Sequence, residues 1–194
     1  MATNYWTNAA TEPKRQFKWT LTLGSLDTQI PGWVIKSTSK PSFNMTEASH
    51  AYLNHTFYYP GKLTWNALEI ALVDPGSPNN DTTNAMMNAI RKMGYAYPNE
   101  TANGMENAQV TFSKAAATSI LGDVVLRQIS PNPEQLGQNL VTEQWTLKQA
   151  WIKDVNFGSL NYDNDGLVDL SMTLRYDWAI HTPGKSNGGI PGIF

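Results

Sequence analysis

The chain has 194 residues, of which 41% are hydrophobic, 15% are charged and none is cysteine, and its formal net charge at pH 7 is −2. This length predicts one domain with its own hydrophobic core, and the absence of cysteine excludes disulfides and thiolate metal sites. The weakly acidic balance argues against a protein that grips nucleic-acid phosphates through a basic face. No secretion signal or membrane-spanning apolar run is visible, so we expect a product made in a cytoplasm with no membrane partner.

The N-terminal part of the chain predicts an arm followed by two strands. Residues 1–14 are polar and lack periodicity, so we interpret them as an N-terminal arm. In FKWTLTL (17–23) apolar and polar residues alternate, which is typical of a half-buried strand. GWVIKSTSK (32–40) predicts a second strand, whereas PSFNMTEASHAY (41–52) fits either a long hairpin or a loop.

The stretch AYLNHTFYYPGKLTWNALEIALVD (51–74) is rich in aromatic residues and poor in reactive ones. It predicts two extended segments that join at Pro60-Gly61. In the second segment, Leu63 and Trp65 share one parity, whereas the apolar series Leu68, Ile70 and Leu72 has the opposite parity. The phase therefore slips near Asn66-Ala67, which indicates a bulge or a strand that exchanges its buried face.

One helix is predicted, over residues 82–93. Apolar residues recur there at helical spacing: Met86, Ala89, Ile90 and Met93. Asp81 or Thr82 can cap its N-terminus, and Gly94 can end it. Residues 95–117 are polar without a period, so we expect an irregular insertion.

Three further strands are predicted in DVVLRQIS (123–130), EQWTLKQAWIKDVNF (143–157) and LVDLSMTLRYDWAI (167–180). The last two are long compared with a typical strand of about 5–6 residues, and NYDNDG (161–166) predicts the hairpin turn between them. The fold class is mainly β: an antiparallel β-barrel or sandwich of about six to seven strands with one helix. The domain is expected to span residues 15–180, with a C-terminal extension over 181–194.

No motif predicts catalytic chemistry. His50 and His55 are five residues apart in an extended segment, so we expect them to face opposite sides and share no metal. Asp163 and Asp165 are spaced like calcium ligands, but Met172 stands where the closing glutamate belongs, which favours an Asx turn. We therefore predict that the protein is not an enzyme and has no cofactor and no metal site.

Several islands of the sequence resemble the tail tube proteins of large contractile-tailed bacteriophages, a family related to the tube proteins of contractile injection systems. In the central island the matching residues are Asn54, Phe57, Gly61, Trp65 and Asp74. A helix follows, as in the family, and MTLRYDWAI resembles its closing strand. FKWTLTL and TLKQAWIKDVNFGSL are similar in place and kind, so the resemblance covers roughly residues 15–180.

The resemblance implies a structural virion protein that polymerises as stacked hexameric rings into the inner tube of a contractile tail, the conduit for DNA ejection. Each subunit would lend strands to a shared barrel around the lumen. The implied partners are other copies of the chain, the tail sheath protein, the baseplate or tube initiator and the tail terminator. The tape measure protein and viral DNA would occupy the lumen, without sequence-specific binding. The implied location is the tail of the virion.

Two sets of residues are predicted to serve this assembly. The polar parities predict the residues that face the lumen: Asn54, Thr56, Thr146, Lys148, Ser171, Thr173 and Arg175. Residues 40–52 and the terminal arms are expected to join successive rings, with the contact centred on Phe43, Asn44, Met45, Thr46 and Glu47. Deleting residues 1–12 should then weaken stacking more than folding.

Other functions remain open on the sequence alone. Within assembly proteins, the chain could be a tube initiator, a baseplate adaptor or the tube subunit of a phage-like injection machine. In another class, seven tryptophans could serve a carbohydrate-binding β-sandwich. Four of them lie on the apolar parities of predicted strands, which favours core packing: Trp19, Trp145, Trp151 and Trp178.

Overall fold

The computed structural model describes six stretches of the chain: residues 13–26, 30–76, 81–97, 112–129, 141–163 and 165–184. Strands dominate, which confirms the predicted fold class, but the described residues form ten strands and two α-helices where six to seven strands and one helix were predicted. The strands are β1 (Trp19–Thr22), β2 (Ile35–Thr38), β3 (Phe43–Tyr52), β4 (His55–Trp65), β5 (Leu68–Val73), β6 (Val124–Ile129), β7 (Val141–Lys148), β8 (Trp151–Asn156), β9 (Asp169–Arg175) and β10 (Trp178–Pro183). The helices are α1 (Thr82–Lys92) and α3 (Lys114–Leu121), with 3-10 turns η2 (Gly24–Leu26) and η3 (Gly32–Val34).

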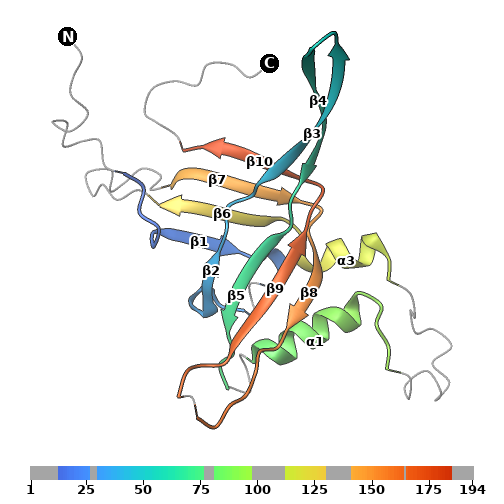
Figure 1. Cartoon of the computed structure of the whole chain (residues 1–194). Coiled ribbons are helices and arrows are strands. Elements are labelled where there is room, and N and C mark those ends of the chain that lie inside the picture. The colour runs from blue at the N-terminus through green and yellow to red at the C-terminus, as the bar shows by residue number, and fades with distance from the viewer. Residues whose placement is uncertain are drawn as a thin grey trace, which may run out of the picture.

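The strands form two four-stranded antiparallel sheets and one separate hairpin. Sheet A has the order β1-β6-β7-β10 and sheet B the order β2-β5-β9-β8, while β3 and β4 pair as a two-stranded sheet. In Figure 1 the strands of sheet A cross those of sheet B at a steep angle, and the hairpin projects from one end of sheet B. The body of the protein is therefore two crossed sheets, as in an orthogonal barrel.

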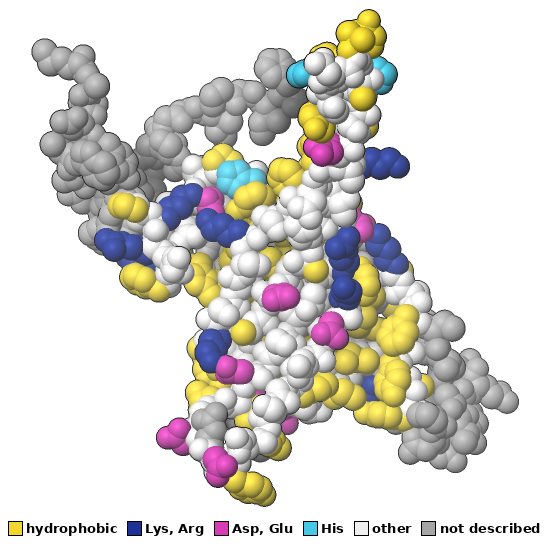
Figure 2. Space-filling view, in the orientation of Figure 1, with side chains coloured by type: hydrophobic (Ala, Val, Ile, Leu, Met, Phe, Trp, Pro, Cys, Tyr) yellow, Lys and Arg dark blue, Asp and Glu magenta, His cyan; other side chains and the backbone are white. Residues whose placement is uncertain are grey.

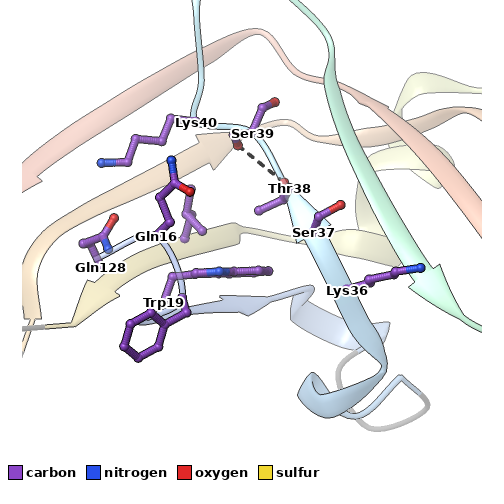
Figure 3. A pocket seen from close by; sticks show the side chains of 10 residues that line it. Gln16, Trp19, Lys36, Ser37, Thr38, Ser39, Lys40 and Gln128 are labelled. Atoms are coloured by element: carbon purple, nitrogen blue, oxygen red, sulfur yellow. Dashed lines mark hydrogen bonds between the residues drawn. The ribbon is translucent and has the colours of Figure 1, made fainter. Parts of the chain in front are cut away.

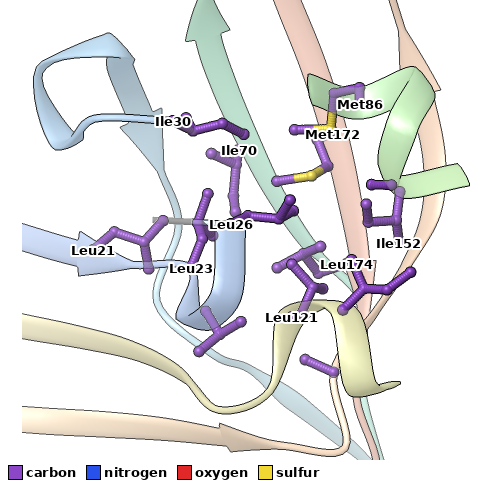
Figure 4. Packing of buried hydrophobic residues seen from close by; sticks show 14 of the residues in the cluster. Leu21, Leu23, Leu26, Ile30, Ile70, Met86, Leu121, Ile152, Met172 and Leu174 are labelled. Carbon is purple, nitrogen blue, oxygen red and sulfur yellow. The ribbon is translucent and has the colours of Figure 1, made fainter. Parts of the chain in front are cut away.

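One hydrophobic cluster joins both sheets and both helices (Figure 4). It takes buried residues from strands of both sheets, such as Leu21 of sheet A and Ile70 of sheet B, together with Met86 of α1 and Leu121 of α3. The predicted tryptophans of β1, β7 and β8 pack against this cluster, whereas Trp178 on β10 is 46% exposed. The core therefore lies between the sheets, and each sheet keeps one outward face.

The two long strands predicted near the C-terminus are each two strands in different sheets. Gln149 has a φ of 57° and separates β7 of sheet A from β8 of sheet B. The buried parity changes there from Leu147 to Ala150 and Ile152. A similar corner at residues 176–177 joins β9 to β10. The prediction of two uninterrupted strands was wrong because a corner residue between two apolar series leaves little mark on composition.

The helix over residues 82–93 is confirmed as α1. The Asp81 side chain caps it by accepting a hydrogen bond from the backbone N–H of Asn84 at 3.0 Å. The second helix, α3, begins inside the segment predicted to be irregular, because Ser113 caps an alanine-rich stretch of good helix formers. Residues 98–111 of that predicted insertion lie outside the described residues. Among the described residues, no helix has the length and apolar character needed to cross a bilayer.

The β3–β4 hairpin reverses direction at Leu53–Asn54, not at Pro60-Gly61 as predicted. Strand β4 runs through Pro60-Gly61, where it contains a bulge: Gly61 and Lys62 together oppose Thr46, whose hydroxyl accepts a hydrogen bond from the Lys62 backbone N–H at 2.8 Å. Proline and glycine mark bulges as well as turns, which explains the error. The predicted phase slip is confirmed, because β4 ends at Trp65 and β5 begins at Leu68.

Candidate assembly surfaces

The outward face of sheet B is polar and shallowly hollowed. It carries Ser37 of β2, Ala71 of β5, Ser171 of β9 and Asn156 of β8 in one row across the four strands. A hollow of about 520 Å³ extends over the same strands. Figure 2 shows the surface over β5 and β9 as mostly uncharged, with isolated acidic and basic side chains. This face therefore offers small polar side chains on a concave surface.

The seven residues predicted to face a lumen do not share one surface. Three lie on the outward side of β9 in sheet B: Ser171, Thr173 and Arg175. Thr146 and Lys148 lie on the outward side of β7 in sheet A, and Lys148 forms an ion pair with Asp123 at 2.5 Å. The other two belong to the hairpin, Asn54 in its turn and Thr56 on β4. On β7 and β9 the alternation matches the outward sides of the strands, but alternation cannot assign a strand to a sheet.

The outward face of sheet A is different in character. Thr146 pairs there with Val125 on one side and Ile180 on the other, and Lys148 pairs with Trp178. Ile180 and Trp178 are both exposed. A face that mixes threonine, lysine and large apolar side chains is better suited to protein contact than to lining a water-filled channel.

Every residue of the β3–β4 hairpin is exposed except Trp65, which is half-buried. Near its root, one side of the hairpin carries Phe43, Met45, Leu63 and Trp65, and the rings of Phe43 and Trp65 meet edge to face at 5.5 Å. Trp65 continues this apolar side into the core, where its ring lies 6.0 Å from that of Tyr176. The root of the hairpin is thus an extension of the protein's own core.

Beyond the bulge, all aromatic residues except Tyr58, which pairs with Ser49, lie on the other side of the hairpin. The extra residue in β4 changes which of its side chains accompany the even-numbered residues of β3. The aromatic side of this distal half consists of His50, Tyr52, His55, Phe57 and Tyr59. The rings of His55 and Phe57 are in edge-to-face contact at 4.8 Å. We call this group the distal aromatic face.

His50 and His55 were expected to face opposite sides, and this prediction was wrong. The turn at Leu53–Asn54 places them on antiparallel strands, where His50 pairs with Phe57 and His55 with Tyr52. They therefore lie diagonally on the same face. Among the residues that the structure describes, no three His, Asp or Glu side chains gather into a group that could hold a metal ion.

The residues predicted to join rings, Phe43 to Glu47, occupy the root half of β3. Phe43 and Met45 lie on the core side of the hairpin, whereas Asn44 lies on the opposite side and donates a hydrogen bond to the Asn66 side chain at 3.1 Å. The predicted segment of residues 40–52 therefore covers the whole of β3. The distal half of β4 lies outside the predicted segment.

Among the residues that the structure describes, the outer strands of both sheets pair on one side only. In sheet B these are β2 and β8, and in sheet A they are β1 and β10. Between β1 and β2 lies a second hollow of about 520 Å³, and Figure 3 shows Gln16 and Trp19 lining it from the β1 side and Lys36 and Lys40 from the β2 side. Edge strands of this kind present unpaired backbone groups that can bind a strand of another chain.

A buried carboxylate ties the N-terminal segment and the hairpin root to sheet A. Glu143 on β7 accepts hydrogen bonds from the ammonium groups of Lys14 and Lys40, which precede β1 and β3 respectively. Its strand neighbour Gln128 donates to the carbonyls of Arg15 and Lys18 at 2.7 and 2.9 Å. Burial acts to raise the pKa of Glu143, but the two lysines outweigh it and lower that pKa from 4.5 to about 2.

No family model matches the chain, and no curated protein matches it. Solved structures of contractile injection systems do match. The tube-terminating cap of the anti-feeding prophage is 18% identical, with a TM-score of 0.54 over 94% of this chain and 99% of that chain. A chain of the six-fold symmetrised anti-feeding prophage baseplate is 13% identical, with a TM-score of 0.57 over 89% of this chain and 97% of that chain.

A third match comes from the PVC sheath-tube complex of an extracellular contractile injection system in its extended state. That chain is 16% identical, with a TM-score of 0.52 over 94% of this chain and 99% of that chain. Identities of this size establish a shared fold. The chain therefore has a fold found in the cap, baseplate and sheath-tube assemblies of contractile injection systems, as the resemblance to tail tube proteins predicted.

Proposed function

We propose that the chain is a non-enzymatic structural subunit that forms stacked hexameric rings, the inner tube of a contractile phage tail through which DNA is ejected. The observation that carries this proposal is the β3–β4 hairpin, a ten-residue and an eleven-residue strand with almost every side chain exposed. Soluble monomers rarely expose an aromatic surface of this extent, so the hairpin is built to be covered by another chain.

Within a ring, sheet B supplies the inner barrel. Its free edges β2 and β8 lie on opposite sides of the sheet, so β2 of one subunit can pair with β8 of the next all round the ring. Such a heterologous contact closes a ring when the rotation between subunits is one sixth of a turn. The outward face of sheet B, with Ser171, Thr173 and Arg175, would then line the lumen.

A lumen of this composition suits the passage of DNA. Phosphates bind where lysine and arginine gather, and the outward face of sheet B instead mixes Ser and Thr with Glu69, Asp154 and an Asp169 that is paired with Lys36. On this arrangement Thr146 and Lys148, on sheet A, face away from the lumen. The sheath would then contact the outer layer, while the tape measure protein and DNA would occupy the lumen.

Stacking of rings falls to the hairpin and the terminal arms, with the baseplate or tube initiator and the tail terminator at the two ends of the stack. A strand rises about 3.4 Å per residue, so the eleven residues of β4 span on the order of 35 Å, whereas the six of β5 span about 20 Å. The hairpin is therefore longer than sheet B and can reach a copy in the adjacent ring.

A tube-end component is the second candidate function. The similarity to a tube-terminating cap and to a baseplate chain is as strong as the similarity to the sheath-tube complex. A cap, initiator or baseplate adaptor would form single rings that do not polymerise. A tube subunit of an injection machine that carries no DNA would polymerise in the same way as a phage tube.

Negative-stain electron microscopy of the purified protein after size-exclusion chromatography tests these roles. Hollow tubes of variable length with six-fold end views are expected for a tube subunit, and single rings for an end component. A subunit that remains monomeric should polymerise when a preformed baseplate is added. A protein that stays monomeric after the baseplate is added would contradict the proposal and favour a carbohydrate-binding β-sandwich.

A further inference from the structure

The hairpin and the β8–β9 connection lie at opposite ends of sheet B. The register pairs Leu68 of β5 with Leu174 of β9, and Val73 with Asp169. The hairpin joins β5 at Leu68, whereas the β8–β9 connection joins β9 at Asp169. Figure 1 shows the same separation, with the hairpin at the top and this connection at the bottom. A hairpin therefore cannot reach the β8–β9 connection of its own chain.

The described residues of the β8–β9 connection include three exposed apolar side chains. Leu160 and Leu167 are 88% and 77% exposed, and Tyr162 is fully exposed between them. The Asn161 side chain accepts a hydrogen bond from the backbone N–H of Asp163 at 3.0 Å, which is an Asx turn. We call Leu160, Tyr162 and Leu167 the apolar pole.

The polar groups beside the two surfaces are complementary as hydrogen-bond donors and acceptors. Asp163 and Asp165 lie between Tyr162 and Leu167 of the apolar pole, and the stretch from Phe157 to Val168 contains no lysine, arginine or histidine. The distal aromatic face has His50 and His55 and no carboxylate. Figure 2 shows histidine and hydrophobic side chains at the hairpin tip, and acidic and hydrophobic side chains at the opposite end. Imidazole donors facing carboxylates would satisfy both groups as the rings become buried.

We propose that the apolar pole of one copy is the docking surface for the distal aromatic face of a second copy in the adjacent ring. The proposal rests on the proposed function, and it names the acceptor on which stacking depends. The bulge opposite Thr46 has a role in it, because it turns the distal aromatic residues away from the side on which the hairpin root joins its own core.

The geometry of this contact leads to a stack and not to a closed dimer. Two different surfaces at opposite ends of one molecule make a heterologous contact, which repeats in one direction without closing. Pairing of two hairpins with each other would instead close after two copies and would bring four histidines together. The head-to-tail contact is therefore the one that agrees with both the charges and the topology.

Cysteine crosslinking tests the contact directly, because the chain has no cysteine of its own. Two single variants, Tyr52→Cys and Tyr162→Cys, are mixed at equal concentration and treated with a short bismaleimide. Both tyrosines are exposed, so neither substitution removes core packing. The matched control mixes Tyr52→Cys with Phe112→Cys, since Phe112 is also exposed but precedes α3, away from the pole.

The expected result is a covalent heterodimer in the Tyr52–Tyr162 mixture at least about ten times more abundant than in the control. Electron microscopy of the same mixtures separates the two proposals. Tubes with equal crosslinking in both mixtures would overturn the docking inference and leave the proposed function intact. Strong crosslinking without rings or tubes would support the contact and count against the tube. Neither crosslinks nor assemblies would overturn both.

Discussion

At the scale of single residues, Glu143 is a buried charged side chain that holds two separate segments of the chain against sheet A. Its carboxylate is 10% exposed and joins Lys14, from the N-terminal segment, to Lys40, at the base of the hairpin. Both lysines are about half exposed, so water can solvate their ammonium groups if the carboxylate is lost. The carboxylate is buried, so water could not solvate it in the same way if the lysines were lost. The position of the hairpin is thus tied to that of the N-terminal segment.

We predict that Glu143→Gln lowers the free energy of unfolding at pH 7 by about 2 kcal/mol. The folded pKa lies near 2, below the unfolded value of 4.5, so this stabilisation is complete above pH 4.5 and is lost as the pH falls toward 2. Urea titrations of both proteins should therefore show a constant gap at neutral pH that narrows in acid. Glu69→Gln, at an exposed position on sheet B, is the control; an equal loss there would contradict the assignment.

Gly61 is required by the bulge because there is no room for a side chain. A Cβ at this position would lie 2.4 Å from the Thr46 hydroxyl and 2.8 Å from the Thr46 carbonyl oxygen. We predict that Gly61→Ala speeds hydrogen exchange of the hairpin amides by on the order of ten-fold. The melting temperature should change little, because no buried core residue belongs to β3 or β4. Gly32→Ala, which meets no atom within 4 Å, should leave exchange unaltered.

At the scale of elements, the corner between β7 and β8 depends on a strained residue. Gln149 has a φ of 57°, a conformation that costs a residue with a side chain about 1 kcal/mol or more. We predict that Gln149→Gly is neutral or slightly stabilising, whereas Gln149→Val lowers stability by about 1–2 kcal/mol because a β-branched side chain tolerates this conformation poorly. Thermal unfolding of the two variants checks this. Equal melting temperatures would show that the backbone strain has no energetic effect.

The sequence predicted those elements whose signal is local. α1 was recognisable from its apolar stripe and from Asp81, and the strands from their alternation. The corners at Gln149 and Tyr176 were missed because each joins two apolar series without a break in composition. Pro60-Gly61 was read as a turn because a bulge and a turn use the same residues.

For the candidate surfaces, the sequence could predict only which residues share a side of one strand. Thr146 and Thr173 both alternate with apolar residues along their own strands, yet they belong to different sheets. Strand order depends on contacts that are distant in sequence, so alternation cannot reveal it. The distal aromatic face was partly visible, since His55, Phe57 and Tyr59 share a parity. The contribution of β3 could not be predicted, because His50 and Tyr52 reach the same face only through the turn at Leu53–Asn54.

At the scale of the whole molecule, the features that would harm a monomer are arranged in complementary pairs. The free edges β2 and β8 bound the same sheet, and the distal aromatic face and the apolar pole lie at its two ends. The two edges face each other across the strands of sheet B, whereas the distal aromatic face and the apolar pole are separated along the strands. In an assembly that repeats both around a ring and along a stack, copies of one chain would cover all four of these surfaces.

This arrangement predicts which side of the subunit faces the lumen. In assembled tubes, a cysteine at Thr173→Cys on sheet B should react with a small maleimide but be protected from a maleimide on a large polyethylene glycol, because the lumen admits only the small reagent. Thr146→Cys on sheet A, which faces away from the lumen in this arrangement, is the matched comparison and should show less size discrimination. Labelling rates in tubes and in dissolved subunits provide the measurement. If the Thr173 cysteine reacts with the large reagent as fast in tubes as in dissolved subunits, sheet B lies on the outside, and the ring must be closed by the edges of sheet A.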